Sequence, residues 1–215
     1  MKKLLLLVTL FMFATLGAYA QDNTDFGLWN DVQVTKSLDK KTDVVGGVRF
    51  DTKRDTRSFA EQRAYGGFNF KEGNWSVQPM LVFLKNFSKK PYYEFRPQVT
   101  VSYKIPINKG LTVTPRVRAE YHFKNNGLKN DGRIVPIINV EKRLSKKYGI
   151  FQTTEVWFPI GNSKDVAKYR QRYFFGISRN VNTHLTVDAF YLFQRDEQVA
   201  PRNNHKLGLT WKIRY

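Results

Sequence analysis

The 215-residue sequence contains no cysteine, which excludes disulfides, thiol catalysis, zinc–thiolate sites and a lipid-bearing cysteine. It has only three histidines, and no metal-ligand spacing, glycine-rich phosphate loop or nucleotide motif, so we expect no metal or cofactor. Acidic residues are scarce, with 18 Asp and Glu against 36 Lys and Arg, for a formal net charge of +18. Long apolar runs are also missing after the first twenty residues, so no helical membrane span is expected.

The first twenty residues have the features of an export signal. Lys2 and Lys3 precede an almost continuously apolar stretch at 4–16, and Ala18 and Ala20 supply the small residues that a signal peptidase requires. A helical span needs roughly 20 apolar residues, so this stretch is too short to anchor the chain. We therefore predict a cleaved signal peptide at 1–20 and one mature domain at 21–215.

The basic balance indicates anionic partners, since excess positive charge favours nucleic acid or an anionic membrane surface. An exported chain rarely meets nucleic acid. We therefore expect outer-membrane lipids as partners, including lipopolysaccharide phosphates, and no nucleic acid.

Apolar and polar residues alternate along most of the mature chain, which is the pattern of half-buried β-strands. At 92–103, for example, Phe95, Val99 and Val101 alternate with Glu94 and Arg96. No convincing helical period is present. This pattern predicts eleven strands, at 26–36, 43–53, 59–70, 75–85, 92–103, 111–123, 132–144, 149–158, 169–179, 184–195 and 205–215.

The length of these strands distinguishes a membrane barrel from a soluble sandwich. A tilted strand that crosses a bilayer needs roughly 9 to 11 residues, whereas strands of soluble domains have a mode near 5 or 6. Short turns alternate with longer loops such as 124–131 and 159–168, as in bacterial barrels. We predict an all-β, antiparallel up-and-down transmembrane β-barrel in the outer membrane. Because single-chain bacterial barrels have an even number of strands, we expect ten or twelve. A soluble periplasmic β-sandwich is the alternative fold.

Aromatic residues near strand ends favour interfacial girdles, to which we assign Trp29, Trp75, Trp157 and Trp211. The chain ends on Tyr215 behind an apolar row. This ending resembles the C-terminal strand by which the barrel-assembly machinery recognises its clients, so that machinery is an expected partner. The sequence leaves a monomer or an oligomer open.

Several motifs resemble the family of small exported barrels known as domain of unknown function 2490. They are Asp-Phe-Gly-Leu-Trp at 25–29, the lysine-rich turn at 37–41, Glu-Phe-Arg-Pro at 94–97, Tyr-Arg-Gln-Arg-Tyr at 169–173 and His-Lys-Leu-Gly-Leu at 205–209. None of them is a catalytic signature. The resemblance covers nearly the whole mature chain and implies an outer-membrane location, but no activity.

Hydrocarbon cannot solvate charge, so the polar rows of the strands should face the barrel lumen. Parity places twelve basic residues there, namely Arg49, Lys53, Arg63, Arg96, Arg116, Arg118, Arg143, Arg170, Arg172, Lys206, Lys212 and Arg214. Eight acidic residues join them, namely Asp31, Asp51, Glu61, Glu94, Glu120, Glu141, Glu155 and Asp188. Phe190 and Leu192 share this inward parity although they are apolar. The candidate site is a charge ladder of Glu94, Arg96, Arg116, Arg118, Glu120, His122, Arg170 and Arg172.

Three functions follow from this ladder. Salt bridges within it would make a structural barrel with a charged and mostly closed lumen, which is the leading prediction. An arginine-lined constriction would instead make a narrow channel for small acidic solutes. A lipid-modifying enzyme would use His122 beside Glu120, but no serine lies on that strand, so we expect no enzyme.

Overall fold

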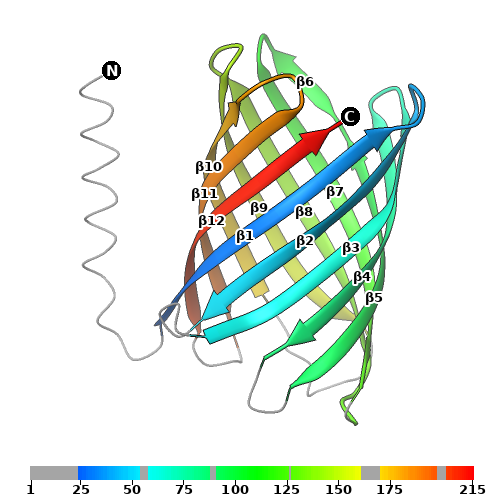
Figure 1. Ribbon diagram of the computed structural model, residues 1–215, viewed down its shortest axis with the longest axis vertical. Helices are drawn as coiled ribbons and strands as arrows, with labels where there is room; N and C mark the ends of the chain where they lie inside the picture. The colour runs from blue at the N-terminus through cyan, green and yellow to red at the C-terminus, as the bar shows by residue number, and fades with distance from the viewer. Residues whose placement is uncertain (1–23, 54–57, 88–90, 126, 161–169, 198–201) are drawn as a thin grey trace.

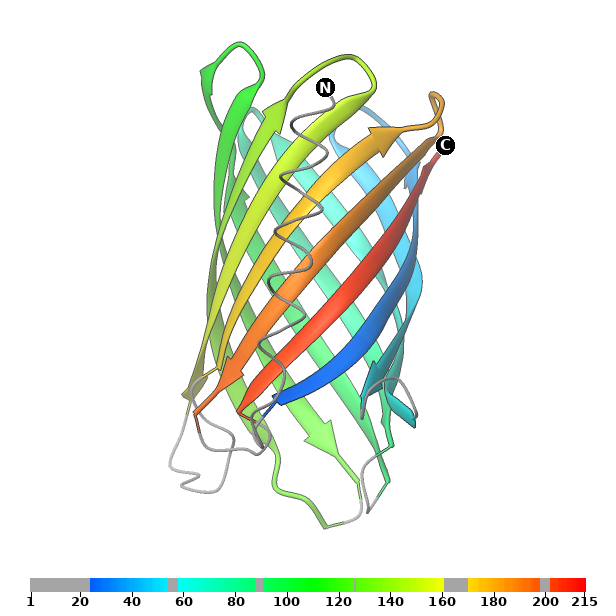
Figure 2. The ribbon, with the colours of Figure 1, turned by 90° about the vertical axis from the view of Figure 1, so that its left-hand side faces the viewer.

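The computed structural model describes residues 24–53, 58–87, 91–125, 127–160, 170–197 and 202–215. The predicted signal peptide at 1–20 lies outside these ranges. The described chain forms a closed, tilted β-barrel (Figures 1 and 2), and it contains no helix that is long and apolar enough to cross a membrane. Its strands are β1 (Thr24–Ser37), β2 (Thr42–Lys53), β3 (Ser58–Glu72), β4 (Trp75–Asn86), β5 (Tyr92–Tyr103), β6 (Ile105–Asn108), β7 (Leu111–Lys124), β8 (Asp131–Arg143), β9 (Tyr148–Ile160), β10 (Arg170–Asn180), β11 (Leu185–Asp196) and β12 (Asn203–Arg214).

Eleven of these strands form the wall, in the order in which they follow one another along the chain. The short β6 follows β5 after Lys104 and pairs with the start of β7, while β5 pairs with the rest of β7. All eleven strands read from the sequence are therefore confirmed within a few residues at each end.

The wall closes through β1 and β12, which lie side by side in Figure 1 and run parallel, from Thr24 opposite Asn203 to Thr35 opposite Arg214. All other neighbours pair antiparallel. The expectation of ten or twelve strands is wrong in requiring an even number. An odd barrel closes when its first and last strands point in the same direction, as they do here.

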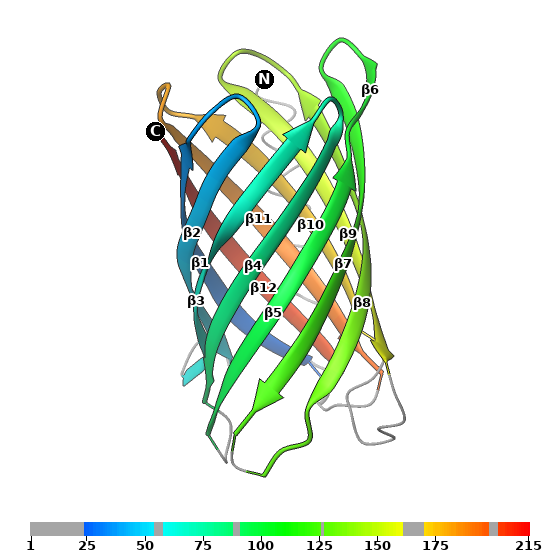
Figure 3. The same cartoon turned by 90° about the vertical axis from the view of Figure 1, so that its right-hand side faces the viewer.

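The two ends of the barrel differ in the length of their connections. Short turns at 38–41, 73–74, 144–147 and 181–184 lie at one end, together with the hairpin of β6 and β7 (Figure 3). The other end carries the strand ends that the remaining connections join, at Lys53 and Ser58, Asn86 and Tyr92, Lys124 and Asp131, Ile160 and Arg170, and Asp196 and Asn203, and most of these connections are longer in sequence. We call these the short-turn end and the long-loop end.

Side chains alternate between the outer wall and the lumen as the period of two predicts. On β1, Trp29, Asp31 and Thr35 are buried, whereas Val32 and Val34 are 37% and 40% exposed. The exposed row is apolar, and the inward row is largely polar. This is the pattern of a barrel whose outer surface contacts lipid.

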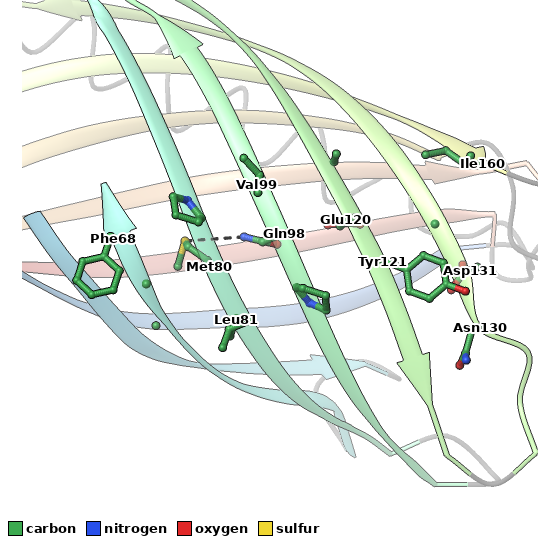
Figure 4. Close-up of a pocket in the computed structure, with 16 residues that line it drawn as sticks. Phe68, Met80, Leu81, Gln98, Val99, Glu120, Tyr121, Asn130, Asp131 and Ile160 are labelled. Atoms are coloured by element: carbon green, nitrogen blue, oxygen red, sulfur yellow. Dashed lines mark hydrogen bonds between the residues drawn. The ribbon is translucent and has the colours of Figure 1, made fainter. Parts of the chain in front are cut away.

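Three prolines interrupt the hydrogen-bonded ladders of the wall, because proline has no backbone N–H to donate. The pairing is broken beside Pro79 between β3 and β4, beside Pro97 between β5 and β7, and beside Pro136 between β8 and β9. A hollow of 1070 Å³ lies over the region of Pro79 and Pro97, with Phe68 and Tyr121 among its lining residues (Figure 4).

Close backbone approaches account for the glycine pairs inside β2 and β3. A Cβ atom at Gly67 would overlap the carbonyl oxygen of Pro79, and one at Gly47 would overlap that of Val32. Gly46 and Gly66, which alternate with them, would tolerate a Cβ at 3.4 Å or more. One glycine of each pair is therefore required by a close backbone approach.

The structure corrects two placements made from the sequence. Trp29 and Trp157 lie inside the barrel, 5% and 3% exposed, and not in a girdle. Asp131 and Asp196, which begin β8 and end β11, are also buried, 4% and 5% exposed. Both pairs occupy the inward parity of their strands, where ion pairs and ring contacts engage them. Trp75 and Trp211 face outward, 56% and 40% exposed.

Candidate functional site

A layer of charged side chains crosses the lumen in the half nearest the long-loop end. We call it the lumen plug. It comprises Asp51 on β2, Glu61 and Arg63 on β3, Glu94 and Arg96 on β5, Arg118, Glu120 and His122 on β7, Glu155 on β9, Arg172 on β10, and Lys206 on β12. Apart from His122, this set contains five basic and five acidic groups. His122 also lies 3.6 Å from Asp131, which pairs with Lys124 and Arg133.

Strands β5 and β7 build one side of the plug. The Nε of Arg96 donates to Oε1 of Glu94 at 2.8 Å, and Nη1 of Arg96 lies 3.8 Å from Oε2 of Glu120. His122 lies between the two carboxylates, with 3.1 Å from Nε2 to Glu120 and 3.1 Å from Nδ1 to Glu94. The second contact lacks hydrogen-bond geometry, so Nδ1 is close to a carboxylate without a directed bond.

Strands β9 and β10 extend the plug around the wall. Nη1 of Arg118 lies 3.6 Å from Glu155, and Nη1 of Arg172 lies 3.8 Å from the same carboxylate. The Nε of Arg172 also donates to Gln194 at 2.7 Å, and its guanidinium lies 4.5 Å from the ring centroid of Trp157. Glu155 is therefore shared by two arginines, one of which stacks on an aromatic ring.

The plug spans the lumen as well as its wall. Glu61 is paired with Arg63 on β3, and Lys206 lies 2.5 Å from Asp51. Glu61 also interacts electrostatically with Arg172, which lies on β10 at the opposite side of the eleven-stranded ring. The charge of Arg172 therefore acts on Glu61 across the lumen, although no ion pair joins these two residues.

The structure brings together six of the eight residues of the predicted ladder: Glu94, Arg96, Arg118, Glu120, His122 and Arg172 belong to the plug. Arg170 lies nearer the long-loop end, where it pairs with Asp196. Arg116 stands apart, because the register places it opposite Ser102 and not beside Glu94 or Arg96.

Sequence reasoning placed Asp51, Glu61, Arg63, Glu155 and Lys206 in the lumen but did not connect them to the site. Inward parity was the available signal. Whether these side chains contact one another depends on how strands that are distant in sequence are aligned. A local sequence pattern does not contain that alignment. The described residues contain no group of His, Asp and Glu that could hold a metal ion.

An aromatic cluster adjoins the plug. Trp29, Phe190 and Leu192 are buried together, with Phe151 and Phe174 packed against them. Trp29 meets Phe190 edge-on with 6.1 Å between ring centroids, and Arg49 lies 4.0 Å above the Trp29 ring. The inward orientation predicted for Phe190 and Leu192 is confirmed.

A cavity of 540 Å³ occupies the lumen on the short-turn side of the plug, and we call it the lumen chamber. Plug residues including Arg63, Arg96 and Glu120 contribute to its lining. Beyond the plug, its lining contains four basic groups, Arg49, Arg116, Lys212 and Arg214, and two acidic groups, Asp31 and Asp188. The part of the chamber lining outside the plug therefore has surplus positive charge.

Comparison with solved structures identifies porin-like barrels. A structure described as the NanC porin is 14% identical, with a TM-score of 0.57, and the match covers 88% of this chain and 99% of that one. The translocator domain of the autotransporter NalP from Neisseria meningitidis is 13% identical, with a TM-score of 0.50, covering 79% of this chain and 72% of that one. At such identities the likeness establishes the fold alone. Among curated proteins, none matches the chain.

A family model described as protein of unknown function (DUF2490) matches residues 26–205, which is most of the chain and nearly all of the barrel wall. This match agrees with the resemblance carried by the motifs at 94–97 and 205–209. The chain therefore belongs to the DUF2490 family of proteins of unknown function, and its fold is a closed, eleven-stranded transmembrane β-barrel.

Proposed function

We propose that this protein is an outer-membrane β-barrel whose lumen is closed to solutes by the lumen plug, and that its role is structural. The observation that carries the proposal is the layer of ion pairs inside the barrel, in which Arg118 on β7 reaches Glu155 on β9 and Lys206 on β12 reaches Asp51 on β2. Each arginine, lysine and carboxylate of the plug lies within 3.8 Å of an opposite charge, so these groups are engaged with one another.

The energetics of buried charge support closure. Glu94, Arg96 and Glu120 are 4%, 5% and 4% exposed. Separating such a pair leaves a charge in a poorly solvated place, which costs about 3 kcal/mol or more. A solute that passed through the plug would have to break several pairs at once. Barrels of about eight strands are filled by side chains and open pores are typical at sixteen or more, so eleven strands are compatible with a filled lumen.

The outer-membrane location is proposed on three grounds: the leader at 1–20, the exposed apolar rows of the wall, and the fold shared with a porin. Fractionation of cells by density centrifugation tests the location. We expect the mature chain, lacking 1–20, in the outer-membrane fraction. Recovery of the folded chain in detergent-free buffer would contradict the proposal.

Two partners are also proposed. Tyr215 is 69% exposed, and its N–H donates to the carbonyl of Thr35 on β1 at 3.0 Å, beside the parallel seam. This terminal aromatic supports recognition by the barrel-assembly machinery. The basic balance of the chain supports contact with lipopolysaccharide phosphates. Assembly assays with Tyr215→Ala and binding assays with purified lipopolysaccharide test the two contacts.

A narrow anion-preferring channel is the second candidate, and the surplus positive charge of the lumen chamber favours it. NanC, which shares the fold, is described as a porin. Solute-swelling assays on liposomes containing the refolded barrel separate the two. A closed barrel gives no swelling above that of empty liposomes. Swelling with small anionic solutes would favour the channel.

The lipid-modifying alternative gains no support from the geometry. His122 is 1% exposed in the lumen, and both of its ring nitrogens lie 3.1 Å from carboxylate oxygens of the plug. A lipid chain would approach from the outer wall, where Tyr121 and Phe123 face outward on the same strand.

A further inference from the structure

The lumen chamber has the form of a binding site that is reached from the short-turn end. The plug lies across its long-loop side. A second cavity of 380 Å³ lies among the short turns, near Ser145 and His184. The two cavities share Gln33, Lys212 and Arg214 as lining residues, so they adjoin.

The two carboxylates that belong to the chamber are already engaged. Asp31 lies 2.9 Å from Nη2 of Arg49 and accepts a hydrogen bond from the Tyr65 hydroxyl at 2.9 Å. Asp188 lies 2.6 Å from Nζ of Lys212 and accepts a hydrogen bond from Ser178 at 2.7 Å. Arg49 and Lys212, two of the four basic groups outside the plug, are therefore already paired with carboxylates.

Arg116 and Arg214 remain without a carboxylate. Neither forms an ion pair with any residue that the structure describes. Arg116 interacts with Glu141 and Glu155 only through longer-range electrostatics. Its Nε is buried and has no hydrogen-bond acceptor within the described ranges. A buried donor without an acceptor costs about 1 to 3 kcal/mol of stability. A ligand that offers a hydrogen-bond acceptor to the Nε of Arg116 would remove this cost.

The chemistry of the walls defines the ligand. A guanidinium presents a planar fork of N–H donors that matches the two oxygens of a carboxylate or a phosphate. Phe151, Phe174 and Phe190 line the same chamber and offer apolar surface. Val82 and Met80 add apolar surface on β4.

We propose that the lumen chamber binds a small organic anion, with its carboxylate or phosphate on Arg116 and its apolar body against the phenylalanine wall, while Arg214 adds positive charge to the same chamber. The site is entered from the short-turn end. It does not depend on closure of the plug, since a bound anion would occupy the chamber in a closed or an open barrel.

Calorimetric titration of the detergent-refolded mature barrel tests the proposal, with benzoate and inorganic phosphate as separate probes. We expect saturable binding of at least one probe, weakening as salt rises. Tighter binding of benzoate supports a carboxylate with an apolar body, and tighter binding of phosphate supports a phosphate ligand. Arg116→Gln should weaken binding about tenfold or more, because it removes the charged fork.

Arg179→Gln is the matched control, because Arg179 lies on the outward row of β10, beside the ring of Tyr148. It removes the same charge without touching the chamber. Arg214→Gln tests the same site through an exposed side chain if Arg116→Gln does not fold. Absence of binding for both probes would overturn the proposal, as would equal affinity in Arg116→Gln, Arg214→Gln and Arg179→Gln.

Discussion

The guanidinium of Arg118 on β7 reaches Glu155 on β9 across the intervening strand β8, with 3.6 Å between Nη1 and Oε1. The side chains of β8 that lie between them are Val135 and Ile137, which are buried and short. The same arginine lies 3.1 Å from Glu120 on its own strand. One cation thus connects two walls of the plug, which makes the plug a single network and not a series of local pairs.

Replacing Glu155 by glutamine should destabilise the barrel by about 3 kcal/mol, because Arg118 and Arg172 would lose their shared carboxylate in a poorly solvated lumen. Urea unfolding in detergent, followed by tryptophan fluorescence, measures the change. Glu72→Gln is the control. Glu72 pairs with Lys41 at the short-turn end, where both side chains are highly exposed, so little change is expected there. Equal stability of the two variants would refute the network.

Shortening Arg172 to alanine should open a path through the plug. This side chain is 5% exposed, pairs with Glu155, donates to Gln194 and stacks on Trp157, so its loss leaves a void as well as unpaired partners. Efflux of a small dye from liposomes containing the refolded variant should exceed that of the wild type. Arg179→Ala, on the outer face of the same strand, should leave efflux at the wild-type level. Efflux no greater than that of this control would show that Arg172 does not obstruct the lumen.

Gly67→Ala should destabilise the barrel by about 2 kcal/mol, since the new Cβ would overlap backbone atoms of Pro79 and Met80 that cannot move independently of β4. Gly66→Ala, one residue away and facing outward, would place its Cβ 3.8 Å from the carbonyl of Val45, an ordinary contact. Heat-modified mobility on detergent gels reports the folded fraction of both. A loss of folding in Gly66→Ala alone would contradict the pairing of β3 with β4, which places Gly67, and not Gly66, against the backbone of β4.

The turn between β1 and β2 should weaken in acid. Oδ1 of Asp39 accepts the N–H of Lys41 at 2.6 Å and that of Thr42 at 2.7 Å, and the hydrogen bond from Lys41 is the main cause that lowers the pKa of this carboxyl. A depressed folded-state pKa contributes stability that is present above the ordinary value of 3.8 and is lost as the pH falls through the folded-state value.

The measurement for this turn is the stability difference between wild type and Asp39→Ala as a function of pH. We expect the difference to be largest at neutral pH and to shrink in acid. Asp39→Asn should remain close to wild type at neutral pH, because its amide oxygen can accept the same N–H groups. A difference that grows as the pH falls would contradict the assignment.

Local pattern determined the strands and their faces. The alternation of Phe95, Val99 and Val101 with Glu94 and Arg96 was sufficient, because a membrane barrel enforces the period of two along every strand. The alternation also gave the eleven wall strands, and only the even-number rule led us to expect ten or twelve. The sequence did not show how an odd barrel closes, because the parallel pairing of β1 with β12 joins segments about 180 residues apart.

The composition of the plug was only partly predictable. Parity identified the inward charges, but the pairing of Lys206 with Asp51 depends on closure of the barrel between its two ends. Trp157 was misplaced because an aromatic near a strand end suits a girdle as well as a lumen stack. The contact between its ring and Arg172 shows that Trp157 lies in the lumen.

Planar-bilayer conductance of the refolded mature barrel, recorded under a salt gradient, tests the closed plug most directly. Insertion is verified independently by protease protection and heat-modified mobility. The account predicts membranes that contain folded barrel and remain electrically silent. Discrete openings of the wild-type barrel, with anion preference that falls in Arg116→Gln, would contradict closure and establish a channel whose selectivity resides in the lumen chamber.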